Sequence, residues 1–169
     1  MTITRVLGVD PGLHKTGWGV VEFRSGLLRF LGCGLIKTKP IEATARRLVV
    51  IDAGLSQIMR DFDIDEAAVE ETFVNQNPAS ALKLGQARGV CLMAVARTGL
   101  DVGEYAPTVI KKSVVGTGRA SKDQVGMMIK TLLPSSGKIS EDEADALAVA
   151  ICHGHHVESR LMQHKKQIF

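Results

Sequence analysis

The sequence has few cysteines, few aromatic residues and no long apolar run. Its three cysteines (Cys33, Cys91 and Cys152) form no CxxC pair, so a disulfide framework is not expected and the pattern favours a reducing compartment. No apolar stretch reaches the length of a membrane span. The segment before the turn at residues 10–12 is too short to be the apolar core of a secretory signal. We therefore expect a cytoplasmic protein that does not partner a membrane.

Charge of either sign is also not in large excess. The formal net charge is +3, and 45% of the 169 residues are hydrophobic, which suits one soluble domain with a real core. A site built from acids would lower the net charge, so the remaining surface must be more basic than the sum indicates. This distribution weakly favours binding to a polyanion.

The spacing of apolar and turn residues predicts alternating strands and helices. Three strands come first and are followed by helices that alternate with two further strands, which is typical of an α/β sheet with helices on its faces. Two capping boxes mark helix starts, Ser121 with Gln124 and Ser140 with Glu143. The predicted strands span residues 5–10, 16–23, 27–37, 67–73 and 101–105, and the predicted helices span 41–62, 78–98, 107–115, 121–133 and 140–156.

Four carboxylates lie where small apolar elements would hold them. Asp142 and Asp145 are three residues apart and therefore neighbours on one face of the last predicted helix. Acids at a helix start interact favourably with the macrodipole, which explains Glu141 and Glu143 well. It explains Asp145 poorly, since aspartate is a weak helix former and Glu would serve better in the second turn. We favour a functional interpretation of the Asp pair.

The two earlier carboxylates are more ambiguous. Asp10 ends a buried strand, but Asp-Pro-Gly is also good turn chemistry and needs no other role. Glu70 and Glu71 are adjacent, so on a strand they point to opposite faces and only one can join a site. Spacing does not choose between them. Hard divalent ions such as Mg²⁺ prefer oxygen ligands, and carboxylates from three elements suit a metal site for phosphate chemistry.

At this point the residues resemble a known family, the RuvC Holliday junction resolvases of the ribonuclease H-like superfamily. The resemblance extends from about Val6 to His153. Its most specific parts are ordered motifs along the chain: Gly8-Val9-Asp10-Pro11-Gly12 with Thr16-Gly17, Val69-Glu70 with Phe73, Ser80-Ala81-Leu82-Lys83-Leu84-Gly85-Gln86-Ala87-Arg88-Gly89, Glu104-Tyr105-Ala106, Lys111 with Val114-Val115-Gly116, Lys122 with Gln124-Val125, and Asp142 with Ala144-Asp145-Ala146-Leu147-Ala148.

The resemblance implies an α/β ribonuclease H-like fold with a five-stranded mixed sheet and helices on both faces. It implies a nuclease domain, which we place over residues 1–156. The polar, basic composition of residues 157–169 separately predicts a flexible tail that the resemblance does not cover. The resemblance also implies a homodimeric endonuclease that nicks two opposed strands of a four-way DNA junction, uses Mg²⁺ or Mn²⁺, and cooperates with a RuvA–RuvB branch-migration complex. The family's acidic metal ligands fall on four positions here, Asp10, Glu70, Asp142 and Asp145.

The resemblance also implies DNA-contacting residues. The family's lysines fall on Lys111 and Lys122, and its base-packing aromatic falls on Phe73. Lys112 and Arg119 belong to the same basic cluster, for which a solvated surface is the alternative and phosphate contact is our interpretation. The hypothesis is that the four acids hold Mg²⁺ for in-line attack of water on a junction phosphodiester, while Lys122 neutralises charge at that phosphate.

Other features leave alternatives open. Gly85 and Gly89 lie on one helix face, and they indicate close approach either to a second copy or to the protein's own sheet. The spacing of His153, His155 and His156 matches no zinc site, and His14 could approach a phosphate beside Asp10.

Three rival functions remain at this stage. An actin-like or sugar-kinase-like ATPase would need two such domains, for which this chain is too short. A YqgF-type RNA-processing nuclease is harder to exclude by the placement of acids. A catalytically silent DNA-binding module would leave the acids without a role.

Overall fold

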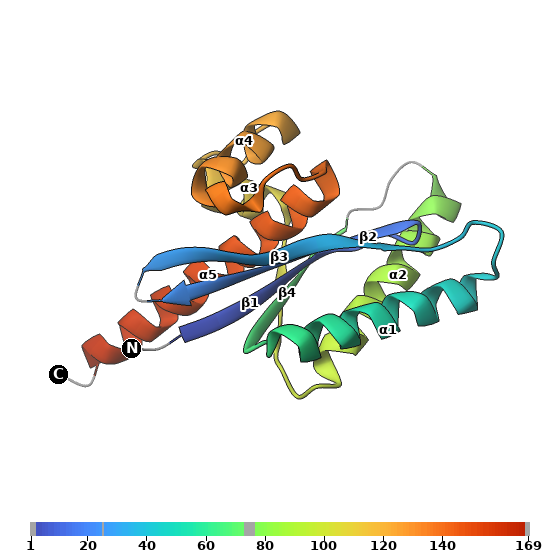
Figure 1. Cartoon of the computed structure of the whole chain (residues 1–169), viewed down its shortest axis with the longest axis horizontal. Helices are drawn as coiled ribbons and strands as arrows, with labels where there is room; N and C mark the ends of the chain where they lie inside the picture. Colours follow the sequence, from blue (N-terminus) through green and yellow to red (C-terminus); the bar gives the residue numbers. More distant parts are fainter. Residues whose placement is uncertain (1–2, 25, 73–76, 168–169) are drawn as a thin grey trace.

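A mixed five-stranded sheet forms the centre of the molecule (Figure 1). The computed structural model describes residues 3–24, 26–72 and 77–167. The strand order is β3-β2-β1-β4-β5. The first three strands form an antiparallel meander, and β4 and β5 run parallel to β1. The strands are β1 (Ile3–Asp10), β2 (Lys15–Arg24), β3 (Leu27–Lys37), β4 (Glu66–Glu70) and β5 (Val102–Tyr105).

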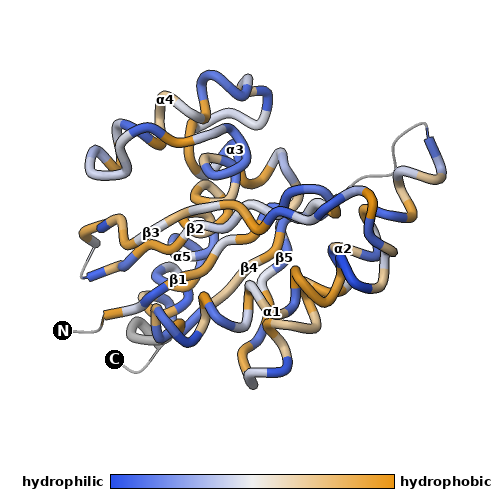
Figure 2. The backbone as a smooth tube through the Cα atoms, turned by 45° about the vertical axis from the view of Figure 1, so that its right-hand side comes forward, coloured by the Kyte–Doolittle hydropathy of each residue, from blue (hydrophilic) through white to orange (hydrophobic). Residues whose placement is uncertain are grey.

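Helices cover both faces of this sheet, as predicted. One core cluster joins the sheet to α1 and α2, and a second joins it to α3, α4 and α5 (Figure 1). Hydrophobic residues run along the central strands between these two layers (Figure 2). The helices are α1 (Thr44–Phe62), α2 (Pro78–Ala96), α3 (Pro107–Val115), α4 (Lys122–Leu132) and α5 (Glu141–Gln167), with a 3-10 turn at Pro134–Ser136.

The helix starts follow the local chemistry of the sequence. The Asn77 side chain accepts hydrogen bonds from the N–H groups of Ala79 and Ser80, ahead of α2. Both predicted capping boxes form. In the second box, the Ser140 N–H donates to the Glu143 carboxylate at 2.7 Å, while the Glu143 N–H donates back to the Ser140 hydroxyl at 3.4 Å. This box fixes where α5 begins.

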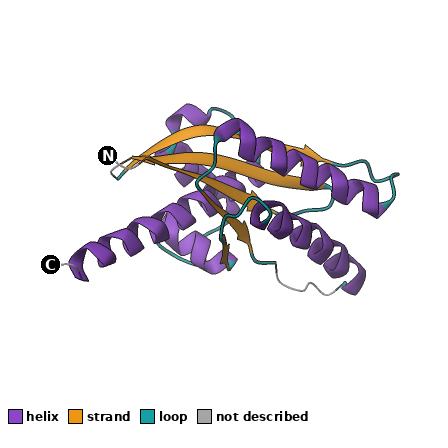
Figure 3. Ribbon diagram, turned by 90° about the horizontal axis from the view of Figure 1, so that it is seen from below, coloured by secondary structure: helices purple, strands orange, loops and turns teal. Residues whose placement is uncertain are grey.

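Three predicted boundaries are wrong. Helix α1 begins at Thr44 rather than at residue 41, because the Glu42 N–H donates to the Lys39 carbonyl and closes a turn there. Strand β4 ends at Glu70 rather than at residue 73. Helix α5 continues to Gln167 instead of ending near residue 156, so the expected tail is largely helical and extends beyond the sheet (Figure 3).

The continuation of α5 has visible support from the body of the protein. Val157 is buried, and the Glu158 carboxylate accepts a hydrogen bond from the Gly26 N–H at 3.2 Å. These contacts hold the helix past the point where the apolar pattern of the sequence weakens. The division into a nuclease domain and a separate tail at residue 157 stays a prediction.

Two glycines let α5 lie unusually close to the sheet. A Cβ atom on Gly8 of β1 would come within 2.1 Å of the Ala146 carbonyl oxygen, and one on Gly17 of β2 within 2.4 Å of the Asp142 carbonyl oxygen. Only glycine allows backbones to approach to this distance. The first turns of α5 are therefore held directly against the ends of β1 and β2.

No helix in the part of the chain that the structure describes combines the length and the apolar character needed to cross a membrane.

Candidate active site

The predicted site forms at one edge of the sheet, where parallel strands end together. Asp10 is the last residue of β1 and Glu70 is the last residue of β4. Ligand sites of α/β sheets collect at this edge, outside the carboxyl ends of the strands. The start of α5 brings Asp145 to the same edge from above.

These three acids line one open cleft of about 460 Å³. Two lysines line the same cleft, Lys111 from α3 and Lys122 from α4. Five elements, β1, β4, α3, α4 and α5, thus supply charged side chains to one space. The full lining comprises Asp10, Pro11, Glu70, Glu71, Thr72, Leu84, Pro107, Ile110, Lys111, Lys122, Val125, Asp145 and Ala148.

The carboxylates of the cleft are crowded and poorly solvated. Burial, followed by the charges of Glu70, Asp145 and Asp142, raises the pKa of Asp10 to about 8. Burial and the charge of Asp145 raise the pKa of Glu70 to about 7. The two carboxyls share a hydrogen bond that favours a proton on Asp10 and the ionised form of Glu70. The site is therefore short of positive charge.

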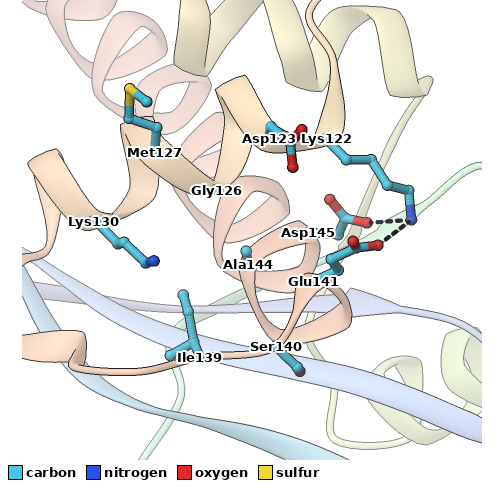
Figure 4. Close-up of a pocket in the computed structure, with 10 residues that line it drawn as sticks. All are labelled: Lys122, Asp123, Gly126, Met127, Lys130, Ile139, Ser140, Glu141, Ala144 and Asp145. Atoms are coloured by element: carbon cyan, nitrogen blue, oxygen red, sulfur yellow. Dashed lines mark ion pairs between the residues drawn. The ribbon is translucent and has the colours of Figure 1, made fainter.

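Lys122 supplies part of the missing positive charge. Its Nζ lies 3.4 Å from Asp145 Oδ2 and 3.6 Å from Glu141 Oε2 (Figure 4). The pair with Asp145 is the main reason that the pKa of Lys122 is raised. The lysine side chain is 59% exposed, so solvent screens these pairs and leaves the ammonium able to meet a ligand.

The turn that carries Asp10 is fixed by hydrogen bonds. The buried hydroxyl of Thr16 donates to the Gly12 carbonyl at 2.8 Å. Arg47 of α1 donates through Nη2 to the Leu13 carbonyl at 3.2 Å, and the Thr38 hydroxyl donates to the same oxygen. The loop after Asp10 is thereby tied to β3 and α1, which fixes the position of the carboxylate.

Arg88 of α2 positions the end of β4, and sequence reasoning assigned it no role. Its Nε donates to the Glu70 carbonyl at 3.1 Å, and its guanidinium forms an ion pair with Glu104 of β5. The side chain joins α2, β4 and β5 directly behind Glu70. Arg88 is 18 residues from Glu70 and 16 from Glu104, so no local spacing in the sequence signals these contacts.

The remaining predicted site residues lie in different places. Asp142 does not line the cleft, although its charge contributes to the raised pKa of Asp10. Lys112 and Arg119 are exposed and lie outside the cleft lining. His14 is exposed and also outside it. Phe73 lies outside the described residues.

The prediction that only one of Glu70 and Glu71 can join the site is wrong. Both line the cleft. Strand β4 ends at Glu70, and the Glu71 N–H donates to the Tyr105 carbonyl at 2.9 Å beyond the strand. The alternation of side chains that holds within a strand therefore no longer applies to Glu71.

The C-terminal histidines have partners of their own. His153 is buried, with Nε2 3.0 Å from Glu66 Oε2 and Nδ1 2.9 Å from the Tyr105 hydroxyl. Because ionised Glu66 can only accept, Nε2 carries the proton and the tyrosine donates to Nδ1. The ring therefore joins β4, β5 and α5 within the core.

Comparison with known proteins decides the family. The model of one protein family, described as crossover junction endodeoxyribonuclease RuvC, matches residues 6–153. The chain belongs to this family. A RuvC protein from Paramagnetospirillum magneticum is 59% identical over 152 residues, covering 90% of this chain and 92% of that protein. The chain is thus identified as a nuclease of the RuvC family.

Solved structures agree with this assignment. A structure of T. thermophilus RuvC in complex with Holliday junction substrate gives a TM-score of 0.84 at 32% identity, covering 91% of this chain and 94% of that chain. The yeast mitochondrial Holliday junction resolvase Ydc2 gives a TM-score of 0.63 at 10% identity, a likeness in fold alone, and covers 88% of this chain and 78% of that one. The predicted α/β, ribonuclease H-like fold is confirmed.

RuvC resolvases are metal-dependent nucleases, and the carboxylate side chains of the cleft are oxygen donors of the kind that hold a divalent metal ion. Among residues 3–24, 26–72 and 77–167, no three Asp, Glu, His or Cys side chains form a ready-made ligand cage. A Mg²⁺ ion does not require one, since it is commonly held by one or two carboxylates together with water and substrate phosphate. The carboxyl groups of Asp10 and Glu70 lie next to each other, and the positive charge around them is too small to balance them, since both pKa values are raised. The cleft therefore fits a hard divalent cation.

Proposed function

We propose that this member of the RuvC family resolves four-way DNA junctions at the Asp10–Glu70–Asp145 cleft, by Mg²⁺-dependent hydrolysis of one phosphodiester in each of two opposed strands. One observation supports the site most strongly. Three acids from β1, β4 and α5 line a single cleft together with two lysines, and the pKa values of Asp10, Glu70 and Asp145 are all raised. That excess of negative charge would be relieved by a bound cation, which can in turn attract a DNA phosphate.

Asp10 and Glu70 would hold the metal from the strand ends, with Asp145 and Asp142 supplying ligands from α5; Mn²⁺ is expected to substitute. When bound, a divalent ion polarises the phosphate and lowers the pKa of a nearby water. The attacking water oxygen forms a bond to phosphorus while the bond to the 3′ oxygen breaks, which leaves a 5′ phosphate and a 3′ hydroxyl.

The lysines of the cleft would bind the DNA backbone. Lys122 and Lys111 line the same cleft as the acids, where each can neutralise a phosphate oxygen. Because Lys122 is already paired with Asp145, it is placed to transfer this contact to a phosphate at the metal. We propose that the exposed Lys112 and Arg119 contact flanking phosphates, and that Phe73 packs against bases at the junction centre.

Cutting two opposed strands requires two sites related by a twofold axis, and we propose a homodimer formed through α2. Leu82, Gly85, Gly89 and Met93 form one stripe on this helix at spacings of three and four residues. Leu82 is 65% exposed and Met93 is 49% exposed. A Cβ at either glycine would meet no described atom within 4 Å, so their own sheet does not account for these glycines.

A crosslinking experiment tests the dimer. Leu82→Cys should be captured as a covalent dimer by a short bifunctional thiol reagent in solution. Val49→Cys on α1, where the side chain is 66% exposed, is the matched control and should stay monomeric. Equal capture of the two variants would contradict assembly through α2. A cytoplasmic location and docking to a RuvA–RuvB motor remain predictions.

The function itself is tested by substrate comparison. Synthetic four-way junctions, plain duplex and structured RNA are incubated with the protein, with and without Mg²⁺. We expect symmetric nicking of the junction alone, and only with the metal present. Preferential cleavage of RNA would favour an RNA-processing nuclease, and junction binding without cleavage would favour a silent binding module.

A further inference from the structure

A second pocket lies beside the cleft, on the other side of Lys122 and Asp145. It has a volume of about 390 Å³ and opens between α4 and the start of α5 (Figure 4). Lys122 and Asp145 line both the pocket and the cleft, so the two spaces are adjacent and share these side chains as a common wall. Nothing in the proposed cleavage chemistry uses the rest of this pocket, which is lined by Asp123, Gly126, Met127, Lys130, Ile139, Ser140, Glu141 and Ala144.

The lining contains a glycine that packing does not explain. Gly126 lies inside α4, where glycine is disfavoured relative to alanine. A Cβ built on it would meet nothing within 4 Å in the described parts of the chain. The space above Gly126 is therefore left open toward the pocket rather than filled by the protein.

The lining combines two lysines and three carboxylates with an apolar part. Lys130 points from α4 into the pocket, and no described carboxylate lies within 4 Å of its ammonium (Figure 4). Met127, with its side chain 71% exposed, and Ile139 add apolar surface. At the cleft side, Lys122 forms ion pairs with both Glu141 and Asp145, which leaves one of their two negative charges unbalanced. Asp123 remains as an acceptor near the start of α4.

A ligand that matches this lining has an anionic end, an apolar flat body and groups that can donate hydrogen bonds. One nucleotide of a DNA strand has all three, in its phosphate, its sugar and base, and the amino groups of the base edge. A wholly cationic pocket would match only a phosphate. The shared wall at Lys122 and Asp145 places such a nucleotide next to the position of the scissile phosphate.

We propose that this pocket binds the nucleotide that flanks the cut on the cleaved strand, with Lys130 Nζ on its phosphate and Met127 and Ile139 against its sugar and base. The inference rests on the proposed junction cleavage and deepens it by extending the path of the strand across α4. Lys130 is thus a binding residue that positions the strand and does not contact the reacting atoms.

The first test compares Lys130→Gln with Lys138→Gln. Lys138 is exposed, directly precedes the lining residue Ile139 in the chain and does not itself line the pocket, so it controls for a general loss of positive charge. The KM for a synthetic junction should rise about 3–10-fold for Lys130→Gln only, with kcat unchanged at saturating junction and Mg²⁺. The slope of log KM against log salt concentration should also become smaller by about 0.9, the contribution of one phosphate contact.

The second test locates the contact on the DNA. Phosphates near the cut are replaced one at a time by neutral methylphosphonates. One replacement beside the cut should weaken binding by the wild type and by Lys138→Gln but leave Lys130→Gln unaffected. If every replacement weakens all three proteins equally, Lys130 contacts no phosphate and the proposal is overturned.

The third test fills the pocket. Gly126→Leu places a side chain in the open space, so the KM for the junction should rise several-fold while the thermal midpoint is not lowered, since leucine favours a helix. An unchanged KM in a folded Gly126→Leu protein would show that no part of the substrate enters. Throughout, wild-type cleavage of the junction tests the proposed function separately, because loss of the flanking subsite leaves that activity in place.

Discussion

Carboxylates lie at both ends of the central sheet, one buried at the first end and three half-buried at the other, and the two ends differ in how their charge is balanced. At one end Glu22 of β2 is only 5% exposed and lies between three arginines, Arg5 at 3.8 Å and Arg24 and Arg29 at 4.0 Å. At the other end Asp10, Glu70 and Asp145 crowd together, with Lys122 as the nearest cation. The negative charge of Glu22, which has a structural role, is balanced by the arginines around it. The positive charge near the cleft acids does not balance their negative charge, as is expected of a site that binds a cation.

The largest expected difference between the two ends is in catalysis. Asp10→Asn should reduce junction cleavage at least about 10³-fold, on the scale seen when one member of a catalytic unit is removed. Junction binding should survive, since removing negative charge from the cleft does not weaken contact with DNA. Gel-shift and cleavage assays on the same preparation measure both. Glu22→Gln, in the fraction that folds, should cleave normally, and a loss of binding by Asp10→Asn would mean that Asp10 is structural.

The same two substitutions should change stability in opposite directions. Glu22→Gln leaves three guanidinium groups without their buried partner and should lower the free energy of unfolding by about 1–3 kcal/mol. Asp10→Asn removes a negative charge that lies close to other carboxylates. It should therefore raise the free energy of unfolding of the metal-free protein at pH 8 by about 1–3 kcal/mol, since one pKa unit corresponds to about 1.4 kcal/mol. Urea unfolding in EDTA measures both values. Destabilisation by both variants would remove the contrast between the two ends.

The raised pKa values also predict how pH acts on the cleft. The folded pKa of Asp10 is about 8, above its usual value of 3.8, and that of Glu70 is about 7. The folded state therefore holds extra protons in this window, and the stability of the metal-free protein should fall as pH rises from about 4 toward 8. Protons compete with the metal, so Mn²⁺ affinity should rise over the same range, by up to about tenfold per pH unit for each proton displaced. Calorimetric titrations at several pH values would measure it, and a pH-independent affinity would contradict the shared deficit of charge.

The smallest effect concerns Glu141, the second partner of Lys122. The pair is exposed, so it is worth at most about 1 kcal/mol. Glu141→Gln should leave kcat unchanged and lower the KM for the junction about 2–5-fold, because Lys122 is freed for phosphate. Glu143→Gln, which changes the same charge at the Ser140 cap, is the control and should lower thermal stability instead. A higher KM for Glu141→Gln would mean that Glu141 orients Lys122 rather than restraining it.

The sequence predicted the elements of the fold well because their signals are local. The Pro78 start of α2, the capping boxes at Ser121 and Ser140, and the apolar stripe of Ala144, Leu147, Ala148 and Ile151 in α5 all depend on neighbours within a few residues. The end of α5 could not be predicted in the same way. It depends on the burial of Val157 and on the contact between Glu158 and Gly26, which are far apart in the chain.

Three of the four carboxylates predicted for the site line one cleft, but the geometry of that cleft could not be predicted from the sequence. The Asp142–Asp145 spacing indicated acids with a function, whereas Asp10 and Glu70 were selected by the family resemblance. Local patterns carry no information on the reach of Arg88 to the Glu70 carbonyl, or on the pairing of Lys122 with both Glu141 and Asp145. The presence of Glu71 in the cleft was missed because β4 was expected to continue past it.

Metal binding to three matched proteins tests the central claim most directly. Mn²⁺ is titrated into the wild type, Asp10→Asn/Glu70→Gln and Glu22→Gln at pH 8, without DNA, and bound ion is followed by electron paramagnetic resonance. Saturable binding by the wild type and by Glu22→Gln, lost in the double variant, is the predicted result. Equal binding by all three proteins would contradict the assignment of the Asp10–Glu70 edge as the metal site.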